Sequence, residues 1–267
     1  MAQESVTSTD GTPIAYQHSG EGPPLVLVHG TSADHTRWKP ILPTFEEHFS
    51  VYAVDRRGRG GSGDSEDYSI EREFEDVAAV VDSLGEPTYL LGHSYGALCA
   101  LGAALLTRKN VSKLMLYEPP VQVVGEEAVA SGVVGRLEAL LEAGDRDAVV
   151  ATMLREVAEV PPEVVEQMRE LPAWQARVAA AHTIPRELRA QEAYWFDPER
   201  FEGLEVPTLL LKGGESPPTF AKGERAVSEA LANCRIVVMP GQGHVAMDTA
   251  TELFTTEVLR FLEEEGP

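Results

Sequence analysis

The sequence predicts an α/β protein in which a mostly parallel, twisted sheet is flanked by helices and carries an inserted helical segment. Three observations lead to this class. Short apolar runs alternate with helical patterns, one long internal stretch shows helical patterns only, and 267 residues are enough to bury the core of one large domain.

The alternation defines the sheet and its crossover helices. Residues 14–18 alternate apolar and polar side chains, which predicts an antiparallel edge strand before the parallel series. Helices are expected at residues 71–84, 95–107, 220–232 and 249–263. The apolar runs predicted as parallel strands are residues 25–28, 51–54, 89–91, 114–117, 208–211 and 235–239.

Residues 121–200 break this alternation. Several amphipathic helical patterns follow one another there, separated by Pro161-Pro162, Pro172 and Pro185, without a strand signal. We therefore expect a helical lid at 121–200, inserted between a first core segment at 1–120 and a second core segment at 201–267. The apolar side chains of the lid can line a pocket or pack the lid onto the core.

Composition excludes several classes of function. A formal net charge of −21 argues against nucleic acid and anionic membrane surfaces as partners. No apolar run is long enough to cross a bilayer, and no cationic segment followed by an apolar one begins the chain, which favours the cytoplasm. Cys99 and Cys234 are too few for a disulfide framework or a zinc cluster. Monomer and homodimer are both open.

One motif indicates chemistry because of the pattern on either side of it. The apolar run at 89–91 leads into Gly92-His93-Ser94-Tyr95-Gly96, and a helical pattern follows. In a strand–turn–helix setting this motif is typical of a nucleophile elbow, with a glycine-rich turn before an ordinary helix as the alternative. The sharp turn requires small residues two positions before and after the serine. We predict Ser94 as a nucleophile at a helix N-terminus, where the helix dipole favours an oxyanion.

With this motif the chain resembles the α/β-hydrolase fold over essentially its whole length, in particular the lid-bearing branch of serine esterases, lactonases and haloperoxidase-like proteins. Val28-His29-Gly30-Thr31 matches the loop after the family's third strand. The resemblance implies an oxyanion hole formed by the backbone N–H groups of Thr31 and Tyr95. Residues 55–62 resemble a structural turn of the family and lack the Gly-Lys-Ser/Thr ending of a phosphate-binding loop.

A serine hydroxyl needs a base to accept its proton. Among seven histidines, His244 in Pro240-Gly241-Gln242-Gly243-His244 follows the last apolar run and precedes the closing helical pattern. This position matches the catalytic loop of the family, so the resemblance implies that His244 is the base. His93 in the turn and His29 in the oxyanion loop are expected to support the scaffold.

The acid that orients the base departs from the commonest family pattern, which places an Asp in the loop after the strand at 208–211. Ser216 stands at that position. Glu118, at the end of the preceding strand, matches an alternative acid position in some family members. Glu215 is one residue from the usual position and can serve if the loop bends differently. We favour Glu118 and keep Glu215 as the alternative.

Together these residues predict a serine hydrolase, without a metal or cofactor, that cleaves a small to medium carboxylic ester or lactone through an acyl-enzyme. Ser94 acts as nucleophile, His244 as base and Glu118 as orienting acid. Amide cleavage and other serine-site reactions are also compatible with this set. The rival from another class is a ligand-binding or signalling protein of the same fold that captures a small molecule and turns it over slowly or not at all.

Overall fold

The computed structural model describes residues 2–124 and 132–264, and one eight-stranded sheet forms the centre of this part of the chain. The strands follow the order β1-β2-β4-β3-β5-β6-β7-β8. All neighbours from β4 to β8 are parallel, whereas β1 and β2 are antiparallel additions at one end. The strands are β1 Ala2–Thr7, β2 Pro13–Ser19, β3 Pro24–Val28, β4 Ser50–Val54, β5 Thr88–His93, β6 Val111–Tyr117, β7 Thr208–Gly213 and β8 Cys234–Met239.

This architecture confirms the predicted α/β class and corrects one detail. Residues 14–18 lie in an antiparallel strand, β2, but the prediction that this strand is the edge is wrong because β1 pairs along it. Five of the six residues of β1 are exposed, and its sequence, Ala-Gln-Glu-Ser-Val-Thr, is largely polar. An exposed strand with few apolar side chains leaves no periodic signal in the sequence.

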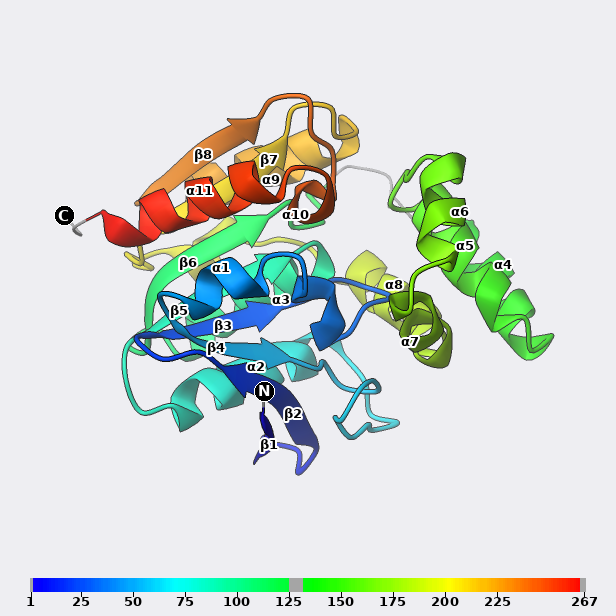
Figure 1. Ribbon diagram of the computed structural model, residues 1–267, viewed down its shortest axis with the longest axis horizontal. Helices are drawn as coiled ribbons and strands as arrows, with labels where there is room; N and C mark the ends of the chain where they lie inside the picture. Colours follow the sequence, from blue (N-terminus) through cyan, green and yellow to red (C-terminus); the bar gives the residue numbers. More distant parts are fainter. Residues whose placement is uncertain (1, 125–131, 265–267) are drawn as a thin grey trace.

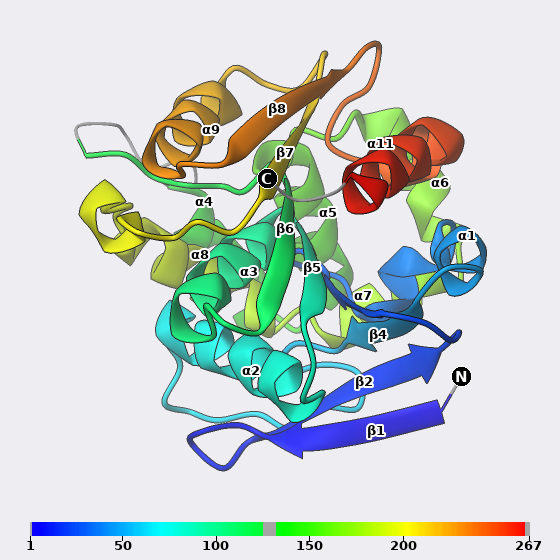
Figure 2. The same ribbon diagram turned by 90° about the vertical axis from the view of Figure 1, so that its left-hand side faces the viewer.

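Helices cover both faces of the sheet, as Figure 2 shows. On one face α2 and α3 pack through Phe74 and Leu98, with α9 contributing Val227. On the other face α1 and α11 contribute Phe45 and Phe254. The covering elements are η1 His35–Trp38, α1 Leu42–Glu46, α2 Ile70–Ser83, α3 Tyr95–Leu106, α9 Thr219–Ala230, α10 Ala246–Thr249 and α11 Thr251–Glu263.

Among the described residues, five α-helices between β6 and β7 form the inserted segment, which we call the lid. They gather beyond the carboxyl ends of the parallel strands (Figure 1) and enclose a hydrophobic cluster of their own. Residues 125–131 of the predicted lid lie outside the described residues. In the described part of the chain, no helix combines the length and apolarity needed to span a bilayer. The lid helices are α4 Val133–Glu142, α5 Arg146–Glu156, α6 Pro162–Arg169, α7 Ala173–Ala179 and α8 Thr183–Ala193, followed by η2 Pro198–Phe201.

A buried group of charges joins the lid to the core. Arg56, after β4, donates to both carboxylate oxygens of Glu73 on α2, at 3.0 and 2.7 Å. Glu187, on the lid helix α8, forms an ion pair with Arg59, and its Oε2 lies 3.2 Å from Nη2 of Arg56. Arg59 also donates to the Thr183 hydroxyl at 2.6 Å. All four charged side chains are at most 1% exposed, so each charge depends on its partner for compensation.

We predict that Glu187→Gln destabilises the protein by on the order of 3 kcal/mol, because it leaves two buried guanidinium groups short of a counter-charge. Urea unfolding measures the effect. Glu138→Gln is the matched control on the lid, since Glu138 forms an exposed pair with Arg189 and should change stability little. Equal unfolding midpoints for the two variants would contradict the assigned role of the buried network.

Candidate active site

Ser94 lies in the tight turn between β5 and α3. Its backbone is held at φ 55° and ψ −128°, a conformation that L-residues rarely adopt. The Ser94 N–H donates to the Tyr117 carbonyl at 2.8 Å, and the Ser94 carbonyl accepts from the Ala97 N–H at 2.8 Å. These bonds hold the strained residue between the end of the sheet and the first turn of the helix.

The glycines around Ser94 are required by space. A Cβ at Gly92 would lie 2.4 Å from the Gly96 carbonyl oxygen, and a Cβ at Gly96 would lie 2.2 Å from that of Val28. A Cβ at Gly30, in the loop after β3, would lie 2.9 Å from the Cβ of Ser94. The turn, the helix start and the loop after β3 therefore approach one another through backbone contacts that a side chain would prevent.

Glu118 and His244 meet although they are 126 residues apart in sequence. Nδ1 of His244 lies 2.5 Å from Oε2 of Glu118, and Oε1 of Glu118 accepts from the Gly213 N–H at 2.7 Å. Glu118 is completely buried and His244 is 8% exposed. The carboxylate thus has a partner on each oxygen, which compensates for the loss of water around its charge.

The backbone conformation of Glu118 explains how its side chain reaches His244. It follows the last residue of β6 at φ 48°, and its N–H donates to the Leu211 carbonyl of β7 at 3.2 Å. This bend directs the side chain across the end of the neighbouring strand. Glu215, the alternative from the sequence, is exposed, and its N–H donates to the Gln242 carbonyl at 2.9 Å. The carboxylate that contacts His244 is therefore that of Glu118.

The loop that carries His244 is held from the core by two side chains. Nε2 of His93 donates to the His244 carbonyl at 2.8 Å. The hydroxyl of Tyr117 donates to the Gly243 carbonyl and accepts from the Ala246 N–H at 3.1 Å. Burial, and then the nearby His244, lowers the pKa of His93 well below its usual value, so its ring stays neutral. His93 was expected to support the scaffold, but no pattern in the sequence connects His93 or Tyr117 to this loop.

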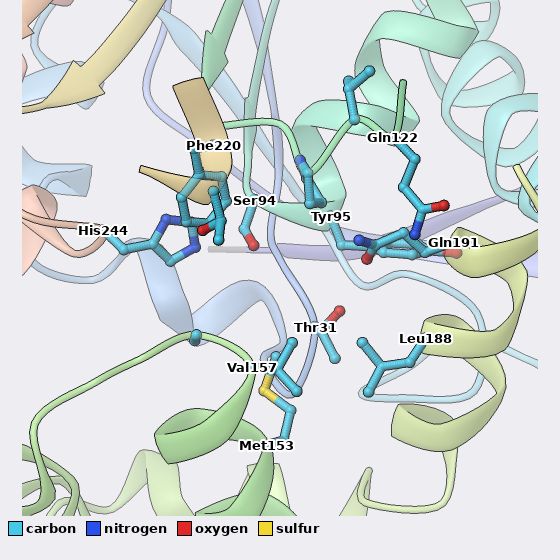
Figure 3. Close-up of a pocket in the computed structure, with 14 residues that line it drawn as sticks. Thr31, Ser94, Tyr95, Gln122, Met153, Val157, Leu188, Gln191, Phe220 and His244 are labelled. Carbon is cyan, nitrogen blue, oxygen red and sulfur yellow. The ribbon is translucent and has the colours of Figure 1, made fainter. Parts of the chain in front are cut away.

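Two small pockets of about 40 Å³ each adjoin Ser94. Figure 3 shows the Ser94 hydroxyl and the His244 ring facing one of them, with Thr31 beside it and Gln122 and Gln191 on the side opposite His244. Tyr95 also lines this pocket. Among the described residues, neither the Thr31 nor the Tyr95 backbone N–H donates a hydrogen bond to a backbone carbonyl in the turns, loops and helix caps. Both groups are thus available to a bound oxygen atom.

The pocket walls come from both the lid and the core and are mostly apolar. Phe220, from α9, stacks on the His244 ring at 5.0 Å between centroids. The Gln122 side chain is 6% exposed, and both its polar atoms lack a hydrogen-bond partner among the described residues. The other apolar wall residues include Val121, Met153, Val157, Ala158 and Leu188. A ligand in this pocket would meet mostly apolar walls with a few polar groups among them.

Asp34, His35 and Asp55 form a cluster whose potential metal-ligand atoms lie within 4.8 Å of one another. Asp55 is fully buried, and its oxygens accept from the His35 N–H and ring, at 2.9 and 2.8 Å, and from the Gly61 N–H at 2.9 Å. The hydrogen bond to Asp55 raises the pKa of His35. These bonds shape the turn at residues 55–62, in agreement with its predicted structural role.

Comparison with known proteins identifies the family of the chain. Residues 25–256 match the model of the alpha/beta hydrolase family. The chain belongs to this family. A crystal structure of an alpha/beta hydrolase from Sphaerobacter thermophilus is 35% identical, with a TM-score of 0.84 over 97% of this chain and 100% of that one. An esterase from a Rhodococcus species is 26% identical, with a TM-score of 0.79 over the whole of both chains.

Among curated relatives of this hydrolase, N-formylmaleamate deformylase from Pseudomonas putida is 35% identical over 118 residues. That match spans 43% of this chain and 44% of the relative, less than half of each.

We predict that Glu118→Gln lowers kcat/KM of this hydrolase by about 10²–10⁴-fold, because a neutral amide neither fixes the His244 tautomer nor stabilises a protonated ring. Glu215→Gln is the matched control and should change kcat/KM little. Ester hydrolysis under pseudo-first-order conditions measures both. A large loss in Glu215→Gln with near-native Glu118→Gln would transfer the acid role to Glu215.

Proposed function

We propose that this hydrolase cleaves a small to medium carboxylic ester or lactone through an acyl-enzyme on Ser94. The observation that supports it most is the buried hydrogen bond between Glu118 and Nδ1 of His244, on a ring that faces the pocket of Ser94 (Figure 3). A carboxylate on Nδ1 leaves Nε2 to accept the proton of a serine hydroxyl.

In the proposed mechanism, Nε2 of His244 takes the Ser94 proton as the hydroxyl oxygen attacks the substrate carbonyl carbon. The imidazolium then protonates the leaving alcohol oxygen when the carbon–oxygen bond breaks. Water, deprotonated by the same nitrogen, attacks the acyl-enzyme and releases the acid and the free serine. Glu118 stays ionised and stabilises the imidazolium in both half-reactions.

The negative oxygen of each tetrahedral intermediate is assigned to the backbone N–H groups of Thr31 and Tyr95. Tyr95 begins α3, so its N–H also carries the positive end of the helix dipole. Such donors contribute a large part of acyl-transfer catalysis because they are already oriented before charge develops.

The pocket supports a short acyl group. The spaces beside Ser94 are about 40 Å³ each, which holds a few water-sized groups and favours a compact acyl group. Amide cleavage is a second candidate reaction, because the partial relative from Pseudomonas putida is named as a deformylase of N-formylmaleamate. The same serine mechanism applies to both bonds, with an amine in place of the alcohol as leaving group.

We predict that Ser94→Ala lowers hydrolysis of short-chain 4-nitrophenyl esters by at least about a thousandfold, since the acyl-enzyme cannot form. A fluorophosphonate should label the native chain at Ser94 and leave the variant unlabelled, as peptide mass spectrometry can show. Activity that survives the substitution would reject the mechanism. Labelling without turnover on a broad panel of esters, lactones and amides would favour a ligand-binding protein of this fold.

A further inference from the structure

Two arginines stand beside the second pocket of Ser94. Arg37, from η1, and Arg177, from the lid helix α7, both line this pocket together with Ser94 and His244. The catalytic roles proposed above use neither guanidinium.

The hydrogen-bond partners of these arginines leave capacity for a ligand. Nη1 of Arg37 donates to Asp248 at 2.6 Å, but Nη2 is buried and lacks a partner among the described residues. The Arg37 side chain is only 6% exposed. Nη1 of Arg177 donates to the carbonyl and hydroxyl of Ser32, at 2.8 and 3.0 Å. Within the described residues, no carboxylate forms an ion pair with Arg177.

The carboxylates nearby are already engaged. Asp248 is bound to Arg37, and Asp34 accepts from the N–H and hydroxyl of Thr36, at 2.9 and 2.5 Å. Burial, and then Arg37, lowers the pKa of Arg177, although a guanidinium still stays charged at neutral pH. A desolvated arginine pair in which one donor, Nη2 of Arg37, lacks a partner among the described residues is stabilised by a bound anion.

An outer cavity leads to the same arginines. It has a volume of about 490 Å³ and lies between the lid helices α6 and α7 and the core at α10. Arg37, Arg177, Met168 and Val245 line both this cavity and the pocket beside Ser94. The arginine pair therefore lies between the larger outer space and the nucleophile, where it can bind one end of a short substrate.

We propose that Arg37 and Arg177 bind a free carboxylate of the substrate, so that the enzyme prefers short esters or lactones that carry a second, ionised carboxyl group. This inference rests on the proposed serine hydrolase function, and it specifies the substrate class. A guanidinium fork matches the planar geometry of a carboxylate, and the unpartnered Nη2 of Arg37 supplies a donor.

The test compares an anionic ester with an uncharged one of similar shape, namely monomethyl glutarate and methyl 5-methylhexanoate, by acid release in a pH-stat. We expect the native enzyme to prefer monomethyl glutarate. Arg177→Met and Arg37→Met should each lower kcat/KM for monomethyl glutarate about 10- to 100-fold, the effect of losing a hydrogen bond to a charged group. Hydrolysis of methyl 5-methylhexanoate should stay within about twofold.

Arg189→Met is the matched control, because it removes an arginine from an exposed pair on the same lid and should leave both rates unchanged. The competing explanation is that Arg177 only holds the Ser32 loop next to Thr31. In that case Arg177→Met lowers both rates equally, which overturns the proposal, as does a native enzyme without preference for the anionic ester. Arg37→Met makes no change to the Ser32 contacts and keeps the test decisive if Arg177→Met folds poorly.

A binding measurement separates this proposal from the hydrolase function. Glutarate titrated into Ser94→Ala by calorimetry should bind, and the affinity should fall about 10- to 100-fold in Ser94→Ala/Arg177→Met. Absence of glutarate binding, while Ser94-dependent ester hydrolysis persists, rejects the carboxylate site and leaves the hydrolase function standing. Arginine-dependent binding without any Ser94-dependent turnover supports the site and rejects the hydrolase function.

Discussion

The close approach of β5, α3 and the loop after β3 is the constraint on which the rest of the site depends. Ser94 adopts a strained backbone conformation there, and the absence of side chains at Gly92, Gly96 and Gly30 makes the approach sterically allowed. The strain is local, but hydrogen bonds from both sides of the turn maintain it. As a result Ser94, Tyr95 at the start of α3, and Thr31 all border one pocket.

The parallel sheet brings the remaining groups to the same edge. The carboxyl ends of parallel strands lie side by side, so residues that follow β5, β6 and β8 become neighbours despite their distance in sequence. Glu118 leaves β6 with a positive φ and crosses the end of β7, where the Gly213 N–H meets its carboxylate. Tyr117 and His93 hold the His244 loop against this edge, so orientation of the imidazole depends on the core rather than on the loop alone.

The lid is part of the site. Its helix α8 is tied to the core through Glu187, and its helix α7 brings Arg177 to the Ser32 carbonyl in the loop that carries Thr31. Direct contacts therefore connect the lid to the proposed oxyanion loop and to the arginine pair. A change in lid packing is expected to affect both the shape of the pocket and the charge that it presents to a substrate.

The sequence by itself determined the α/β class, the inserted helices, and the positions of Ser94 and His244 after two of the predicted strands, because these features have local patterns of apolar periodicity and glycine spacing. It left Glu118 and Glu215 open as partners of His244. Only the tertiary structure decided that contact, since it depends on the bend after β6 and on the order of the strands. The structure alone also revealed two further features, the exposed edge strand β1 and the position of Arg37 and Arg177 in one pocket with Ser94. Neither leaves a periodic signal in the chain, because one lacks apolar residues and the other arises from contacts between segments far apart in sequence.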